Sequence, residues 1–272
     1  MKVNSSMMTV CADDNIFMLV YILTFPKIKA RLLPSPELQF GRNSTVDSRS
    51  TEQGQWNLQG KTFVKTSTLK SFGCLIFAPA NKCPIETAKK YMRSLMAAYT
   101  GHGGIVENNN PLINYATPPS IGKSIQEFWR AVGNQVKMRP QILFFIVPFK
   151  QAMPYNEIKQ FCETELGCVS QCEYLFIRIT WKKITNTSVL GALLQHVFTC
   201  KPQYLSNVCM KLNAKVGGAT CYLTPSNNRL HNRGFNMMIG ADVSHAAPGV
   251  QKPSFASMVG STDCKYFVFL SR

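Results

Sequence analysis

The strongest constraint on the fold is an uninterrupted apolar hexapeptide, ILFFIV at residues 142–147, which lies between Gln141 and Pro148. A strand with one solvated face alternates apolar and polar side chains, whereas this run is apolar at both parities. Such a strand is buried on both faces, which is typical of a parallel sheet covered by helices. We therefore expect an α/β protein. The 272 residues are 45% apolar, which is enough to bury a core of ordinary size.

Strand-like and helix-like segments alternate around this run. A buried strand is predicted at 69–79 and a short one at 168–173, and apolar residues recur at helical spacing in four segments: 85–101, 124–136, 154–167 and 201–216. The intervening segment 101–119 is rich in Asn and Pro, and we expect a loop there. A last strand is predicted in 235–245. The alternation indicates a doubly wound α/β domain followed by the start of another sheet.

Neither a membrane segment nor a disulfide framework is expected. The apolar run at 16–25 has ten residues, whereas about 20 are needed to span a bilayer. Two carboxylates lie directly upstream of it, which disfavours a secretory signal and favours a buried strand or a segment outside the fold. The ten cysteines contain no C-x-x-C pair, so we interpret them as buried thiols in a reducing compartment.

The net charge of +16 makes a polyanionic partner a natural candidate. Between Glu173 and Asp242 there is no Asp or Glu, while eight Lys and Arg occur. A phosphate backbone would balance this charge, although a solvated basic face is the alternative for any single lysine. Lys211 and Lys215 are four residues apart in a predicted helix, so they share one face. Tyr155 and Lys159 have the same spacing at the start of another helix, where free N–H groups also favour an anion.

Four motifs together resemble the Argonaute family: PYNEIK at 154–159, the Gln171–Cys172 pair, QYLSNVCMKLNAKVGG at 203–218 and MIGADVSHAAPG at 238–249. The resemblance implies a Rossmann-like MID domain with a parallel sheet, followed by the first strands of a truncated, RNase H-like PIWI domain. The implied boundaries are a segment outside the family pattern at 1–25, a linker at 26–68, MID at 69–225 with an insertion at 174–200, and the N-terminal part of PIWI at 226–272.

In Argonautes the MID domain holds the 5′-monophosphate of a small guide RNA. The resemblance assigns this role to Tyr155, Lys159, Gln171, Lys211 and Lys215, with the tyrosine stacked on the first base. Clustered cations suit a terminal phosphate because it carries more charge than an internal diester. The expected partners are a guide RNA, its target RNA and silencing-complex proteins, in the cytoplasm or the nucleus.

Asp242 matches the first carboxylate of the PIWI active site, which in intact family members cuts target RNA with two Mg²⁺ ions. Two-metal hydrolysis needs several convergent ligands. Asp263 is the only other acid after Asp242, His245 is expected to be structural, and the family's remaining catalytic residues would lie beyond Arg272. We therefore expect no cofactor and no nuclease activity in this chain.

Two functions remain open on the sequence alone. The first is guide binding through the 5′-phosphate pocket without a complete cleavage site. The second is a non-catalytic protein-interaction fragment, or a truncated gene product, with no useful affinity for RNA. The insertion at 174–200 matters for this choice because it separates Gln171 from the helix that carries Lys211 and Lys215.

Overall fold

A computed structural model describes residues 35–46, 57–116, 120–148, 152–174, 177–180, 191–194, 197–224, 237–245, 253–261 and 269–271. The segment 1–25 and Asp263 lie outside these residues, as do Arg229 and Arg233. Among the described residues, no helix is both long and apolar enough to cross a membrane.

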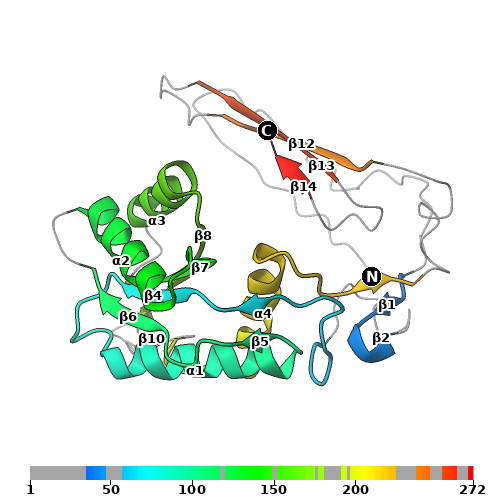
Figure 1. Cartoon of the computed structure of the whole chain (residues 1–272), viewed down its shortest axis with the longest axis horizontal. Coiled ribbons are helices and arrows are strands. Elements are labelled where there is room, and N and C mark those ends of the chain that lie inside the picture. Colours follow the sequence, from blue (N-terminus) through cyan, green and yellow to red (C-terminus); the bar gives the residue numbers. More distant parts are fainter. Residues whose placement is uncertain are drawn as a thin grey trace, which may run out of the picture. The chain divides into compact units, whose positions relative to one another are not determined.

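Four parallel strands form the central sheet, in the order β6-β4-β7-β8 (Figure 1). They are β4 (Phe72–Ile76), β6 (Leu112–Tyr115), β7 (Ile142–Val147) and β8 (Val169–Tyr174). All six residues of β7 are fully buried, as the apolar hexapeptide predicted. The α/β class and the parallel sheet inferred from the sequence are therefore confirmed.

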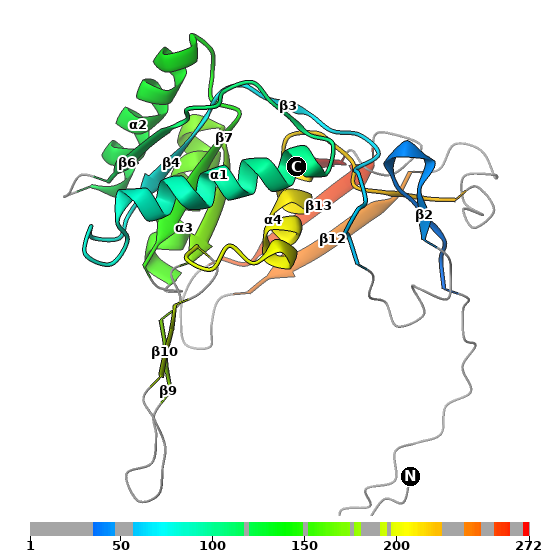
Figure 2. The same ribbon diagram turned by 90° about the horizontal axis from the view of Figure 1, so that it is seen from below.

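Two apolar layers cover the two faces of this sheet. On one face α1 (Ile85–Gly101) and α4 (Pro202–Lys215) pack on Phe72, Phe144 and their neighbours (Figure 2). On the other face α2 (Ile121–Val136) and α3 (Ala152–Gln160) pack on Leu143 and Phe145. The alternation of side chains along each strand thus supplies both cores, which is the doubly wound arrangement.

Local sequence signals account for two helix boundaries, the start of α2 and the end of the η2 turn. Ser120 caps α2 by accepting a hydrogen bond from the backbone N–H of Lys123. A π-helical turn (η2, Phe161–Leu166) continues α3 and ends at Gly167, which has a positive φ of 54°. The α3 helix begins at Ala152, two residues before the predicted start at Pro154, because proline is tolerated within a first helical turn.

A close approach between layers depends on Gly73 in β4. A Cβ atom at this position would lie 2.6 Å from Cγ2 of Val132 and 2.8 Å from Cζ of Phe128. The missing side chain therefore lets α2 pack directly on β4.

The prediction of a loop over 101–119 was wrong in part. This segment contains β5 (Ile105–Val106), which pairs in parallel with β3 (Thr68–Leu69), and the edge strand β6. Edge strands are short and carry polar residues, so the Asn- and Pro-rich composition hid this one. Asn114 is the exposed residue of β6.

The predicted linker also contains regular structure. The strands β1 (Leu38–Gln39) and β2 (Thr45–Val46), joined by a 3₁₀ turn (η1, Gly41–Asn43), pair with β11 (Tyr222–Leu223) in a small antiparallel sheet. Buried His102 holds this region to the helices: its Nδ1 lies 2.7 Å from the Lys61 carbonyl and its Nε2 2.9 Å from Ser206 Oγ.

The remaining strands are antiparallel. The strands β9 (Ile177–Thr180) and β10 (Gly191–Leu194) pair with each other, within the predicted insertion. The strands β12 (Ile239–Ser244), β13 (Phe255–Ser261) and β14 (Phe269–Ser271) form a separate three-stranded sheet. All eight cysteines described are free thiols, and five of them are buried, as expected.

Candidate functional site

The candidate site lies at the edge of the central sheet formed by β8. Because β8 is the last strand in the order, its outer backbone groups face no strand of the described sheet. Alternation places Gln171 and Glu173 on the face covered by α1 and α4, and Ser170 and Cys172 on the face covered by α2 and α3. Side chains from both layers can therefore reach this edge.

Lys159 reaches the edge from α3. Its Nζ lies 2.9 Å from the hydroxyl of Ser170 and 3.3 Å from the carbonyl oxygen of the same residue. Glu163, one turn later, pairs with it at 3.5 Å. The Glu163 side chain is 64% exposed, so water screens this ion pair and leaves much of the lysine's charge available.

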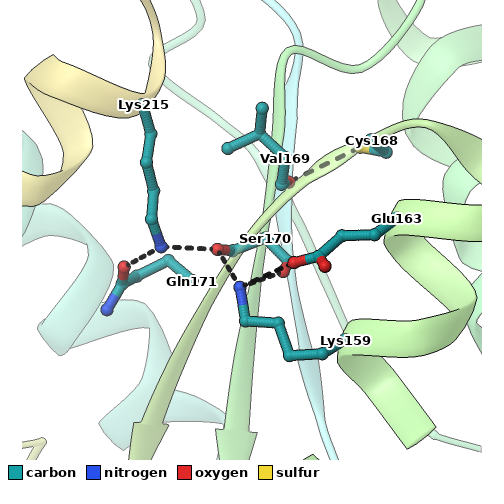
Figure 3. A network of polar contacts seen from close by, with 7 residues as sticks. All are labelled: Lys159, Glu163, Cys168, Val169, Ser170, Gln171 and Lys215. Atoms are coloured by element: carbon teal, nitrogen blue, oxygen red, sulfur yellow. Dashed lines mark hydrogen bonds and ion pairs between the residues drawn. The ribbon is translucent and has the colours of Figure 1, made fainter. Parts of the chain in front are cut away.

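Lys215 reaches the same edge from α4, on the opposite face (Figure 3). Its Nζ donates to the Ser170 carbonyl at 2.7 Å and to Gln171 Oε1 at 2.6 Å. The Ser170 carbonyl therefore accepts from two ammonium groups, one from each layer (Figure 3). Partial burial lowers the pKa of Lys215, and the charges of Lys159 and Lys211 lower it further.

Beneath the lysines lies a buried carboxyl group. Glu173 is 1% exposed and accepts from Gln171 Nε2 at 3.1 Å and from the Tyr204 hydroxyl. Burial raises the pKa of this carboxyl, and the hydrogen bonds from Tyr204 and Gln171 partly oppose that effect. Burial and the nearby carboxylate also raise the pKa of Tyr204.

The other two predicted residues lie one turn before the contacting lysines. Lys211 is exposed on α4, and its charge lowers the pKa values of Lys215 and Glu173. Tyr155 is half-buried on α3, four residues before Lys159. The structure thus brings Lys159, Gln171 and Lys215 together directly. It brings Lys211 within electrostatic range and places Tyr155 on the helix face of Lys159.

Asp242 lies elsewhere, on the exposed strand β12, opposite Ser257 of β13. Its Oδ1 accepts from the backbone N–H of Val243 at 2.9 Å. His245 follows, with Nδ1 2.8 Å from Ser254 Oγ. In the described part of the chain, no three His, Cys, Asp or Glu side chains are placed so that they could hold a metal ion together. The described residues therefore do not fit a two-ion site of the kind that Mg²⁺ would need.

A cavity of about 940 Å³ lies between α1 and the β5–β6 segment. Met92, Met96, Leu112 and Arg93 are among its lining residues, and none of the predicted site residues lines it. It is distinct from the cationic edge, by which we mean the group of Lys159, Ser170, Gln171, Glu173 and Lys215 at β8.

Two family models match the chain: the Mid domain of argonaute at residues 50–131 and the Piwi domain at residues 142–271. The chain belongs to the Argonaute/Piwi family. A relative from Schizosaccharomyces pombe, "Protein argonaute", is 31% identical over 252 residues, which is 88% of this chain and 27% of the relative. This Argonaute-family chain spans about a quarter of the length of the curated relatives it matches.

Solved structures agree on the fold. The C-terminal lobe of a budding yeast Argonaute has a TM-score of 0.67 at 20% identity, covering 89% of this chain and 48% of that one. The Argonaute of Kluyveromyces polysporus, solved with a guide RNA, has a TM-score of 0.64 at 20% identity, covering 89% and 28%. The lobe comparison supports the expected combination of a MID fold with part of a PIWI fold.

Sequence reasoning on this Argonaute-family chain missed two residues of the cationic edge, Ser170 and Glu173. Ser170 contributes its hydroxyl to Lys159 and its carbonyl to both lysines, and the carbonyl, as a backbone acceptor, leaves no trace in residue type. Glu173 was recognised only as the last acid before the basic stretch. Its position two residues after Gln171 on a strand could have placed both side chains on one face.

Proposed function

We propose that this chain binds the 5′-phosphate of a small guide RNA at the edge of β8, as part of RNA-guided silencing. The observation that carries the proposal is the convergence of Lys159 and Lys215, from opposite layers, on the Ser170 carbonyl. A neutral carbonyl balances neither charge. In the described part of the chain, neither Lys211 nor Lys215 forms an ion pair.

A terminal phosphate fits this arrangement. It carries a charge of up to −2, which Lys159, Lys211 and Lys215 can neutralise. Its oxygens can also accept hydrogen bonds from the ammonium N–H groups that do not donate to Ser170 or Gln171. Tyr155, on the same face as Lys159, would stack on the first base and contribute about 1–3 kcal/mol without selecting its identity. The family membership and the guide RNA in the related yeast structure support this choice of ligand.

Direct binding tests the proposal. The purified chain should bind an oligonucleotide with a 5′-monophosphate more tightly than the same RNA with a 5′-hydroxyl, at physiological salt. Equal affinities would refute a terminal-phosphate site. Absence of binding to either RNA would favour the alternative, a protein-interaction role without RNA affinity.

We further propose that the 272-residue chain does not cut a target paired to its guide. Asp242 contributes one carboxylate, and a single carboxylate cannot hold two hydrated divalent ions in fixed geometry. Incubation of the loaded chain with labelled target and Mg²⁺ or Mn²⁺ should leave the target intact. Cleavage that Asp242→Ala abolishes would overturn this proposal.

A further inference from the structure

We infer that Glu173 is a positioning residue for the phosphate site: it turns the Gln171 amide so that the amide oxygen faces Lys215 and helps to hold that ammonium group at the edge of β8. The inference rests on the proposed function for its consequence in binding. Its structural basis is a chain of hydrogen bonds from Glu173 through Gln171 to Lys215.

Chemistry fixes the orientation of the Gln171 amide. An ammonium group only donates, so the Gln171 atom 2.6 Å from Lys215 Nζ is the oxygen. The Gln171 amide nitrogen then faces the opposite side, where Glu173 Oε1 accepts from it at 3.1 Å. In the reverse orientation the amide nitrogen would face the Lys215 ammonium, another donor, and the amide oxygen would face the Glu173 carboxylate, another acceptor.

Burial makes this orientation strict. Gln171 is 7% exposed and Glu173 1% exposed, so water cannot replace a lost partner at low cost. Tyr204 from α4 holds the other carboxyl oxygen, Oε2, and so keeps Oε1 directed at Gln171. Without an acceptor at position 173 the amide nitrogen would keep only its longer bond, to the Cys172 carbonyl at 3.4 Å, and the amide could rotate away from Lys215.

The titratable groups that interact with Glu173 come from four of the elements around it: α1, β4, β8 and α4. They are Tyr91 of α1, Cys74 of β4, Cys172 of β8, and Tyr204, Lys211 and Lys215 of α4. Of these, the two lysines are the cations, and both belong to the proposed phosphate site. The carboxyl group and the bound phosphate would therefore compete for the same positive charge.

Two substitutions separate positioning from charge. Glu173→Met removes the acceptor and keeps the shape, so it should weaken binding of the 5′-phosphorylated RNA about 10-fold and leave the 5′-hydroxyl RNA unchanged. Glu173→Gln keeps an acceptor oxygen and removes the charge, so it should retain or increase the affinity. Glu163→Gln, at the exposed acid beside Lys159, is the control for removal of a nearby negative charge.

Wild-type affinity for the phosphorylated RNA in a folded Glu173→Met variant would overturn the inference. If that variant loses both RNAs equally or fails to fold, the RNA-free wild-type chain decides by NMR. The side-chain amide signal of Gln171, assigned by its loss in Gln171→Met, should shift as Glu173 titrates, and Glu173→Gln should abolish this shift. If the Gln171 signal does not shift as Glu173 titrates, the positioning role is refuted. If the wild-type chain binds 5′-phosphorylated and 5′-hydroxyl RNA equally, only the proposed function is refuted.

Discussion

Replacement of Lys215 by methionine tests the cationic edge most directly. The substitution keeps an unbranched apolar stem and removes the donor to Ser170 and Gln171. If the ammonium also donates to the phosphate, the loss of one hydrogen bond between charged groups costs about 1.5–3 kcal/mol, which is about 10- to 150-fold in Kd. The loss should fall on the 5′-phosphorylated RNA and spare the 5′-hydroxyl form.

The thermal stability of Lys215→Met, in contrast to its RNA affinity, should not decrease. The pKa of Lys215 is lower in the native chain than in the unfolded chain. Between these two pKa values the lysine is therefore protonated more often in the unfolded chain than in the native one. Below the native pKa the lysine charge is therefore less favourable in the folded chain than in the unfolded one, and this cost declines between the native and the unfolded pKa and is absent above the unfolded value. Lys215→Met should leave the thermal midpoint at pH 7 unchanged or raised, despite the two lost hydrogen bonds.

Fluorescence anisotropy with the two RNAs is a suitable assay, and Lys90→Met is the matched control. Lys90 is exposed on α1 and carries the same charge, but it contacts neither Ser170 nor Gln171. It should change the affinity for both RNAs slightly and equally. If Lys215→Met and Lys90→Met give the same loss of affinity, the cationic edge is not the phosphate site and the reasoning from its geometry fails.

Three further predictions concern the fold and the two carboxylates. Gly73→Ala should lower the free energy of unfolding by about 1–3 kcal/mol in denaturant titrations, because the new methyl group collides with Val132 and Phe128, whereas Gly101→Ala, with open space around it, should not. For Glu173, the native pKa lies above the unfolded one, so stability should fall as pH rises from about 4.5 through the native value. Thermal melts of Glu173→Gln should lack this decline; an unchanged pH profile would contradict the burial argument. Asp242→Ala should not alter the affinity for 5′-phosphorylated RNA, because this exposed residue on β12 contacts none of the lysines.

Elements with a strong local pattern could be predicted from the sequence, and β6 could not. The run at 142–147 indicated a buried parallel strand because all six side chains are apolar. The helix at 85–101 has the predicted bounds because its apolar spacing and terminal Gly101 agree. The strand β6, by contrast, is ordered by its pairing with β4. Such pairing between distant segments leaves no local pattern in four residues near prolines, so the sequence indicated a loop there.

The candidate site divides in the same way. Helical spacing put Tyr155 with Lys159 and Lys211 with Lys215, and the family resemblance added Gln171. The atom on which Lys159 of α3 and Lys215 of α4 converge could not be predicted from the sequence. It is the backbone carbonyl of Ser170, on the outermost strand of the sheet. The burial of Glu173 depends on α1 and α4 closing over it, which is a tertiary property.

The edge position of β8 has a consequence for the long segment at 174–200. This segment joins the outermost strand of the sheet to α4, so a change in its length need not displace another strand of the sheet. Extra residues in such a connection cost only loop-closure entropy, about 0.6 kcal/mol for each doubling of length. The 2.6 Å contact between Lys215 and Gln171 spans this segment and is intact. A change in the length of this connection should therefore leave the contact between Lys215 and Gln171 in place.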